Sequence, residues 1–470
     1  MEKSSQNHPD SSLPIGSRLE LMVDDYLIER MDGTCLQLQT PHPMPLAKSP
    51  LKGGYVTVIK DGDRYRAFYR SNEPAYSGTH FDGNSSEITC YAESADGHEW
   101  MFPKLGLVKM AGNCENNVVL KKSPFCHNFS PFLDARPDVV PAERFKALAG
   151  LHEEGINAAR GVDPHAVPAE NKGGLYAFAS PDAIHWHSLS SGPVIRSEAA
   201  GKFGFDSQNV SFWSEAEGCY VCYFRTWQVP AGQSFSWNGN VLRSISRVTS
   251  PDYLNWSAPQ ALEPNEPGEH LYTSQTHPYF RAPHIYVATP TRFMADREES
   301  TDILFMTARG NAPYARPFKE AIIRPGLDPA RWGNRANYVA LNVVPTGPKE
   351  MSIYHNHSGY RFVLRTDGFA SVHASHTGGE MLTRAFTFLG SELVLNLSTS
   401  AAGSIRVEIQ DAEGWPIPGY GLEDCAVIVG DEIARTVHWT QGSDVRALAG
   451  KPIRLRFVMM EADLFALQFR

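Results

Sequence analysis

The stretch SPDAIHW, residues 180–186, combines turn-forming residues with a tryptophan, and its pattern recurs along the chain. SADGHEW spans residues 94–100, SPDYLNW spans residues 250–256, and a shorter copy, LDPARW, ends at Trp332. The four aspartates of the shared Asp-x-x-x-Trp pattern lie 86, 70 and 76 residues apart. Because recurrence at a roughly fixed spacing is typical of propellers and solenoids, the motif predicts a repeated supersecondary unit.

Strand-like segments precede the first three copies of the motif. SEITCYAES, GLYAFAS and RSISRVTS each end at the serine that opens a copy, and all three are rich in residues that favour strands. The segment KDGDRY, residues 60–65, predicts a hairpin with a tight Asp-Gly turn. We therefore expect each repeat to hold a four-stranded antiparallel sheet. The aspartate would accept backbone N–H groups in the turn, and the tryptophan would pack between neighbouring sheets.

The number of repeats predicts the architecture. Four motif copies mark four junctions, and residues 350–374 supply strands for a fifth sheet, so we expect five blades, with six as the alternative. The early segment RLELMVDDYLIER, residues 18–30, is expected to pair with the last blade and close the ring, which removes exposed sheet edges. After about residue 380 the motif is absent, and short apolar strands with glycine-rich turns predict a β-sandwich.

The predicted fold is therefore all-β, a five-bladed β-propeller followed by a C-terminal β-sandwich. The expected boundaries are a disordered tail over residues 1–16, the propeller with the active site over residues 17–375, and the sandwich over residues 376–470.

Composition and charge limit the classes of partner. A hydrophobic content of 42% and a charged content of 20% are ordinary for a globular protein, and the net charge of −9 disfavours nucleic acid and anionic membranes. The first 16 residues show no signal peptide and no apolar run is long enough to span a membrane, so a cytoplasmic protein is expected. A secreted protein whose signal peptide has been removed is the alternative. No His/Cys cluster suggests a metal, and no cofactor is predicted. The sequence leaves the oligomeric state open.

The three longer motif copies, together with the later segment RTDGFASVHA at residues 365–374, give the chain a family resemblance. It resembles five-bladed propeller glycoside hydrolases of the invertase/inulinase and arabinanase/xylosidase kinds. The resemblance implies an oligosaccharide or polysaccharide substrate and cleavage of a glycosidic bond in the central pocket. Sialidases also repeat an Asp/aromatic turn, but theirs is one residue longer between the two, so the chain is less similar to them.

Candidate catalytic residues come from the start of the first strand of each predicted blade, because this innermost strand lines the centre of a propeller. Glycoside hydrolysis normally needs two carboxyl groups across the scissile bond. Asp206 in GFDSQN and Glu350 in PKEMS are the acids at expected strand starts. We expect Asp206 to act as nucleophile, base or stabiliser and Glu350 as the acid. The alternative for each is a solvent-facing loop charge.

Polar side chains near the same strand starts are expected to bind sugar hydroxyls. These predicted substrate-binding residues are His127, Asn128, Gln208, Asn209, Gln275, His277, Arg281 and Arg335. Arg281 lies in an apolar segment, where a charge needs a partner, so it either clamps a carboxylate or forms a structural ion pair. His127 and His277 are acid/base candidates, although lone histidines are more often structural. Arg331 and Asn334 are further candidates for the pocket rim.

The first blade departs from the resembled families, which carry an acid in its first strand. The expected first strand here, GGYVTVI at residues 53–59, has none, and Asp24 or Asp25 is the alternative source. This departure favours the alternative of a propeller that binds glycans without cleaving them. A further alternative is a lyase that uses His and Arg on uronate-containing sugars.

Overall fold

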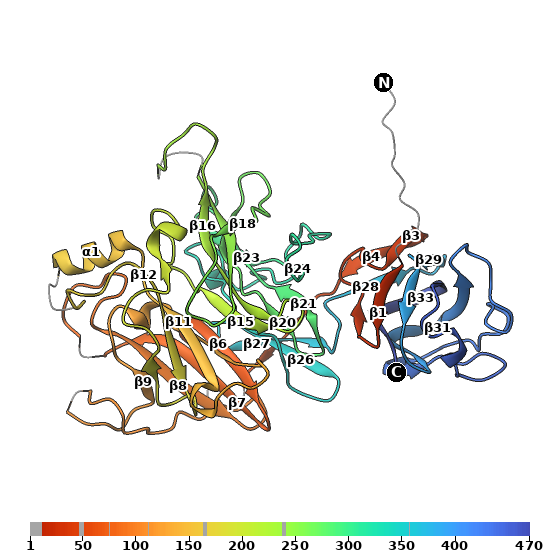
Figure 1. Ribbon diagram of the computed structural model, residues 1–470, viewed down its shortest axis with the longest axis horizontal. Coiled ribbons are helices and arrows are strands. Elements are labelled where there is room, and N and C mark those ends of the chain that lie inside the picture. The colour runs from red at the N-terminus through yellow and green to blue at the C-terminus, as the bar shows by residue number, and fades with distance from the viewer. Residues whose placement is uncertain are drawn as a thin grey trace. The chain divides into compact units, whose positions relative to one another are not determined.

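The computed structural model describes residues 12–46, 51–74, 76–110, 112–162, 167–236, 241–356 and 358–470. In this part of the chain nearly all regular structure is β, and the one α-helix is α1 (Glu153–Val162) (Figure 1). The chain divides into two compact units. The propeller unit comprises residues 41–363, and the second unit combines the chain before residue 41 with residues 364–470. None of the helices described is both long and apolar enough to cross a membrane.

Five successive antiparallel sheets build the described part of the propeller unit, which confirms the predicted all-β class and repeat order. The first sheet contains β6 (Gly54–Asp61), β7 (Arg64–Asn72), β8 (Glu87–Ser94) and β9 (Val118–Leu120). The second sheet contains β10 (Ser130–Leu133), β11 (Phe145–Ala149), β12 (Gly174–Ser180), β13 (His187–Ser188) and β14 (Ile195–Arg196). The third contains β15 (Val210–Ser214), β16 (Cys219–Gln228), β17 (Leu242–Ser250) and β18 (Gln260–Ala261).

The fourth blade consists of two three-stranded parts. One part contains β19 (His270–Thr273), β22 (Thr291–Met294) and β23 (Ser300–Ile303), and the other contains β20 (His277–Tyr279), β21 (Ala282–Ala288) and β24 (Met306–Arg309). The fifth sheet contains β25 (Val344–Pro345), β26 (Glu350–Tyr354), β27 (Tyr360–Arg365) and β5 (His42–Pro45). The expected hairpin between β6 and β7 is present, with Gly62 at a positive φ of 58° in its turn.

The first strands of the sheets lie next to one another. β10 contacts both β6 and β15, β15 contacts β20, and β25 contacts β6. A parallel bridge between Thr57 and Leu341 shows that the chain leading into β25 runs in the same direction as β6. The sheets are therefore arranged around a common centre, and the starts of their first strands share one end of the unit, called here the strand-start end.

The strand that completes the fifth sheet differs from the prediction. β5 pairs with β27, with His42 opposite Val363. The segment 18–30 instead contributes β2 (Glu20–Leu21) and β3 (Ile28–Asp32) to the second unit, where Met22, Leu27 and Ile28 enter the core. The pairing of β3 with β29 (Gly379–Thr383) joins residues about 350 positions apart, and no local sequence signal reports such a contact.

The repeated motif forms the predicted turn. In the copy at residues 180–186, Asp182 Oδ1 accepts hydrogen bonds from the N–H groups of Ile184 (2.9 Å) and His185 (2.8 Å), and Ser180 Oγ accepts one from Ala183 N–H (2.9 Å). The same bonds recur around Asp96 and around Asp252. Although burial alone raises the pKa of Asp182, the hydrogen bonds from the backbone and side chain of His185 and from Ile184 N–H lower it to about 2.

Aromatic residues of the turns pack against the preceding sheet, as expected. The ring of Trp186 lies 6.1 Å from Phe68 of β7, and that of Trp100 lies 5.7 Å from Tyr354 of β26. The fourth copy differs, because Trp332 is 57% exposed and Asp328 caps a short 3-10 helix, Pro329–Arg331. Three copies are therefore junction turns, whereas the fourth is a surface turn.

The second unit is also all-β. Its described strands form one ten-stranded network in which β31 (Leu393–Asp411) pairs with β33 (Ile453–Phe469) along most of its length. The network is completed by β1 (Leu13–Gly16), β2, β3, β4 (Thr34–Leu38), β28 (Ala370–Ala374), β29, β30 (Phe386–Phe388) and β32 (Asp431–Thr436). These strands surround one apolar core.

The predicted boundaries need two corrections. The tail was expected to reach residue 16, but Leu13–Gly16 form β1, which pairs with β30 and buries Ile15 completely; residues 1–11 lie outside the described part. The propeller was expected to end at residue 375, but β28 pairs with β33 and belongs to the second unit. Strand alternation is the same in both units, so it did not mark where one ended.

Candidate functional site

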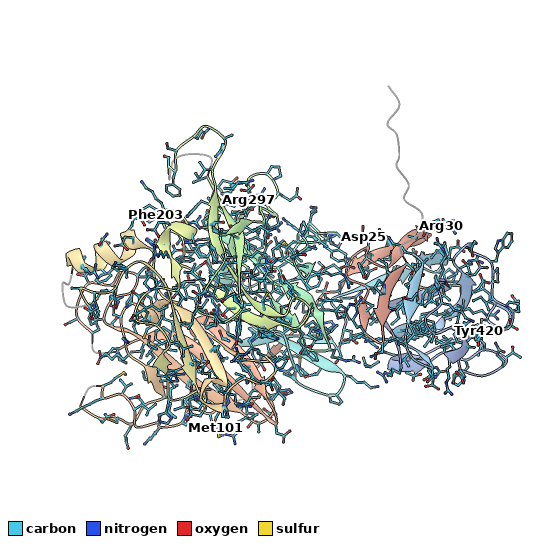
Figure 2. The ribbon with its side chains drawn as sticks, viewed as in Figure 1. Asp25, Arg30, Met101, Phe203, Arg297 and Tyr420 are labelled. Carbon is cyan, nitrogen blue, oxygen red and sulfur yellow. The ribbon has the colours of Figure 1, made fainter. Side chains whose placement is uncertain are left out.

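A cavity of about 760 Å³ lies at the strand-start end of the propeller unit. Phe203, Trp227, Tyr272 and Phe293 provide aromatic surface in it, and its charged lining residues are Asp82, Glu154, Asp206, Arg243, Glu299 and Arg335. Figure 2 shows Phe203 on the opposite side of this unit from Met101, which lies in the turn region beyond β8. The cavity is thus at the end where sequence reasoning placed the site.

Asp206 is the predicted catalytic residue that lines this cavity. It lies four residues before β15, and its side chain is 20% exposed. Its carboxylate forms an ion pair with the guanidinium of Arg225, which is 1% exposed. Its main-chain carbonyl accepts hydrogen bonds from the Tyr55 hydroxyl (3.0 Å) and from His127 Nε2 (3.0 Å). Both the side chain and the backbone of Asp206 are therefore fixed.

Arg225, Arg243 and Arg335 form an arginine cluster around the aromatic surface. The guanidinium carbons of Arg225 and Arg243 each lie 5.0 Å from the centroid of the Tyr272 ring. That of Arg243 is also 4.9 Å from the ring of Trp227 and 4.9 Å from the ring of Phe293. Cation–π contacts of this kind favour a guanidinium held over a ring.

The charges of the cluster are only partly compensated. Arg225 pairs with Asp206, and Arg335 donates a 2.6 Å hydrogen bond to Glu299. No carboxylate of the described residues forms an ion pair with Arg243, whose Nε is buried without a hydrogen-bond partner. The arginine cluster with its two carboxylates thus carries one excess positive charge.

These charges change the titration of neighbouring groups. Burial alone would raise the pKa of Tyr272, but the positive charges of Arg225, Arg243 and Arg335 outweigh it and lower this pKa. Burial, then Arg243 and Arg225, lowers the pKa of His270 to about 4, so its imidazole is neutral at pH 7. Burial and repulsion by Arg225 lower the pKa of Arg243 to about 10. The site is therefore electrostatically prepared for negative charge.

A second group of lining residues comes from the region of α1. Glu154 lies in the first turn of this helix, and its carboxylate is 3.3 Å from Nδ1 of His152. Burial lowers the pKa of His152, although Glu154 and Asp82 oppose that shift. Asp82 and Glu154 are two carboxyl groups of the cavity for which the described residues provide no arginine or lysine partner.

His127, which was predicted to bind substrate, is buried beneath the cavity. Its Nδ1 lies 2.9 Å from the Glu87 carboxylate and 2.8 Å from Nη1 of Arg70. Its Nε2 donates to the main-chain carbonyl of Asp206. His127 therefore positions Asp206 and does not itself line the cavity.

Asn128 and Asn209 hold the loop that carries Asp206. The side-chain amide of Asn128 donates to the carbonyl oxygens of Gly150 (2.8 Å) and Ser207 (3.2 Å), and that of Asn209 donates to Ser207 (3.0 Å). Both asparagines are fully buried. The structure gives them supporting roles rather than the predicted contact with a sugar.

Gln208 and Gln275 join the first strands across the centre of the unit. Gln275 Nε2 donates to Gln208 Oε1 (2.8 Å) and to the carbonyl of Val339 (2.7 Å), and Gln208 Nε2 donates to Thr57 Oγ1 (2.9 Å). Each glutamine is 1% exposed. Neither lines the cavity, so the prediction that they bind substrate is not supported by their positions.

His277 is likewise a buried link. Its Nδ1 lies 2.9 Å from the carbonyl of Gln275, and its Nε2 accepts a 3.0 Å hydrogen bond from the N–H of Val343. Burial lowers its pKa to about 4. His277 is therefore a neutral imidazole that connects the first strands of the fourth and fifth sheets, not an acid/base group of the cavity.

Glu350 does not meet Asp206, which corrects the predicted catalytic pair. The first strand of its sheet is β25, and Glu350 begins the second strand, β26, beyond the hairpin at the opposite end from the strand starts. Its carboxylate accepts hydrogen bonds from Arg361 and Thr346, both 2.9 Å, and lies 3.5 Å from His98. The sequence reading began this sheet one strand too late, because β25 has only two residues.

Arg281 lies in the turn between β20 and β21, also away from the strand starts, and does not line the cavity. Arg331 donates to Asn337 Oδ1 (2.9 Å), and Asn334 occupies a turn with a positive φ of 49°. Asp24 and Asp25 belong to the second unit (Figure 2). Of the predicted substrate-binding residues, Arg335 is the one that lines the cavity.

Sequence reasoning missed Arg225, Arg243 and Tyr272. The arginines lie in β16 and β17, the second and third strands of the third sheet, whereas the predicted catalytic residues come from expected first strands. A signal was available, because CYFRTW and VLRSIS each place an arginine within a strand that also carries apolar residues. A buried charge in such a strand needs a functional or structural partner.

Among the described residues, no group of three or more His, Cys, Asp or Glu side chains is placed to hold a metal ion.

Neither a protein-family model nor a curated protein matches this chain. Similar solved structures include a family-43 arabinoxylan arabinofuranohydrolase from Bacillus subtilis, with 13% identity, a TM-score of 0.40, and 90% of this chain and 96% of that chain covered. A thermostable family-43 glycoside hydrolase has 14% identity, a TM-score of 0.43, and coverage of 69% and 95%. A β-1,2-mannobiose phosphorylase from Listeria innocua has 11% identity, a TM-score of 0.43, and coverage of 71% and 98%.

Proposed function

We propose that the protein is a carbohydrate-active enzyme that cleaves a glycosidic bond in the cavity, with Asp206 as a catalytic carboxylate. The position of Asp206 carries the proposal. Its partly exposed carboxylate lines a cavity that also presents the rings of Phe203, Trp227 and Tyr272. Aromatic faces pack against the apolar faces of sugar rings, while a few placed polar groups bind the hydroxyls.

Asp206 is suited to the role of nucleophile or base. A neighbouring guanidinium favours the ionised form of a carboxyl group, and Arg225 is in direct contact with this one. An ionised carboxylate can attack the anomeric carbon or remove a proton from water. The hydrogen bonds from Tyr55 and His127 to the Asp206 carbonyl hold it in place for that step.

The proton donor must be a different acid from the predicted Glu350. Glu299 is poorly suited, because its hydrogen bond from Arg335 lowers its pKa and keeps it ionised at neutral pH. Glu154 and Asp82 line the same cavity. We assign the acid role to Glu154, which borders the cavity from the first turn of α1, and Asp82 is the alternative.

Elimination is the second candidate reaction, and the environment of Tyr272 favours it. A lyase needs a base that removes the proton next to a uronate carboxylate and a positive group that neutralises that carboxylate. The phenol of Tyr272 has a lowered pKa and is surrounded by the arginine cluster. These features match the two requirements.

A glycan screen with product analysis tests the proposal. Hydrolysis gives a new reducing end and a saturated product, whereas elimination gives an unsaturated product that absorbs near about 235 nm. Asp206→Asn is expected to lower the rate of hydrolysis by at least about 100-fold, and Glu154→Gln to lower it similarly for substrates with a poor leaving group. Unchanged hydrolysis by Asp206→Asn would refute the catalytic assignment. Binding without any cleavage across the screen would identify a glycan-binding propeller.

A further inference from the structure

The guanidinium of Arg243 forms no ion pair with any carboxylate of the described residues. It is partly buried, lies between the rings of Trp227 and Phe293, and has a buried Nε without a hydrogen-bond partner. Burial of a charge is costly unless the charge is paired and hydrogen-bonded. A cation in this state, on the wall of a cavity, is therefore a strong indication of a ligand.

The neighbouring charges increase that cost. Burial, together with repulsion by Arg225 and Arg335, lowers the pKa of Arg243 to about 10. The phenols of Tyr272 and Tyr338 oppose this shift but do not outweigh it. Asp206 and Glu299 are already engaged by Arg225 and Arg335. The other two carboxylates of the cavity, Asp82 and Glu154, form no ion pair with Arg243.

The surroundings of Arg243 also indicate what carries the missing negative charge. A free inorganic anion needs only cationic and N–H groups, whereas this cation is stacked between aromatic rings in a cavity of about 760 Å³. A cavity of that volume holds a ligand larger than one oxyanion, and its aromatic surface suits sugar rings. A guanidinium binds two oxygens of a carboxylate or sulfate group in parallel.

We infer that the cavity selects carbohydrates that carry an oxyanion, a uronate carboxylate or a sulfate ester, and that Arg243, assisted by Arg335, binds that group. The inference rests on the proposed function for the carbohydrate, and it adds the substrate class. Arg225 has a different task, because it is already bound to Asp206. The bound anion would supply the ion-pair partner that Arg243 lacks.

Calorimetric binding to matched sugars tests the inference without depending on cleavage. Three series of short oligosaccharides are compared, identical except that one sugar carries a hydroxymethyl group, a carboxylate or a sulfate ester. We expect at least one anionic series to bind about 10-fold or more tighter than the neutral one, with an advantage that falls as salt is added. Asp206→Asn protein allows the same measurement if the wild type cleaves the ligand.

Variants locate the discrimination. Arg243→Gln is expected to weaken binding of the anionic series by about 10- to 100-fold and that of the neutral series by much less, with a smaller loss for Arg335→Gln. Arg64→Gln is the matched control, because Arg64 is exposed in the hairpin at the other end of β6 and lies outside the cavity. Arg243→Gln removes an unpaired cation, so its melting temperature should equal or exceed that of the wild type, which separates loss of binding from unfolding.

Three results would overturn the inference. They are equal binding of neutral and anionic sugars, retention of the anionic preference in Arg243→Gln, and binding of inorganic sulfate or phosphate as tight as that of the anionic sugars. The proposed function fails separately. Tight binding of anionic sugars without cleavage would support the inferred substrate class and refute the proposed enzymatic function. Asp206-dependent cleavage of neutral sugars alone would support the enzymatic function and refute the inferred substrate class.

Discussion

The carboxylate of Asp206 forms an ion pair with the guanidinium of Arg225 at the strand-start end of the propeller unit. Arg225 is 1% exposed and Asp206 is 20% exposed, so one partner is anchored in the protein while the other borders the cavity. This arrangement fixes a carboxylate at the wall of the cavity.

Removing the charge of Asp206 should also destabilise the protein. Asp206→Asn leaves Arg225 buried without its partner, and breaking a buried pair typically costs about 3 kcal/mol in the free energy of unfolding. In the double variant with Arg225→Met the unpaired charge is absent, so part of that loss should be recovered. Urea denaturation of the two single variants and the double variant measures the coupling. Additive losses would show that the two side chains do not interact.

The turn aspartates should matter for stability and not for catalysis. Asp182→Ala removes the acceptor of two backbone hydrogen bonds, which is expected to cost about 1 kcal/mol, as for loss of a helix cap. Turnover should be unchanged, since Asp182 is at a sheet junction outside the cavity.

The same turns predict how stability depends on pH. The pKa of Asp182 in the folded protein is about 2, below the ordinary value of 3.8. A carboxyl group with a lowered folded pKa stabilises the protein above its unfolded pKa, and this contribution is lost as pH falls from about 4 towards 2. Melting temperatures of the wild type and Asp182→Ala should therefore converge as the solution is acidified through this range. A constant difference would contradict the assigned hydrogen bonds.

Tyr272 should ionise at a lower pH than its neighbours. The arginine cluster lowers its pKa, whereas burial raises the pKa values of the nearby Tyr55 and Tyr338. Titration followed by phenolate absorbance should show an early component that disappears in Tyr272→Phe. In Arg243→Gln that component should move to higher pH, because one of the cations that lower the pKa is gone. An unchanged early component in Tyr272→Phe would assign it to another residue.

Gln275 should behave as a structural residue despite its predicted role in binding. Gln275→Ala leaves Gln208 Oε1 and the carbonyl of Val339 without their donor in a buried region, at an expected cost of about 2 kcal/mol. The dissociation constants of bound glycans should not change in the folded variant. Reduced affinity at unchanged stability would instead support the sequence prediction.

Local patterns in the sequence predicted the parts of the fold that depend on local interactions. The Ser-x-Asp-x-x-x-Trp turns need only a hydroxyl, a carboxylate and an aromatic ring at fixed spacing, and three of the four copies form the same hydrogen bonds. Hairpins such as β6–β7 follow from the Asp-Gly turn. Long-range pairings were not accessible in this way, and the early segment 18–30 was assigned to the wrong unit for that reason.

The candidate site was predicted in part. Asp206 lines the cavity because it directly precedes the first strand of its sheet, β15, and Arg335 lines the cavity from a surface turn. Glu350 failed because the two-residue strand β25 leaves almost no pattern in the sequence. Arg225 and Arg243 come from β16 and β17 of the third sheet, and Tyr272 comes from β19 of the fourth blade. Only folding brings these three residues together.

Turnover by Asp206→Asn and Glu350→Gln on one glycan substrate tests the central claim most directly. Both variants remove a carboxylate that is bound to an arginine, but one is in the cavity and the other is at the far end of the sheets. Loss of at least about 100-fold in Asp206→Asn with nearly wild-type turnover in Glu350→Gln is the predicted result. Full turnover in Asp206→Asn, or an equally large loss in Glu350→Gln, would contradict the placement of the active site in this cavity.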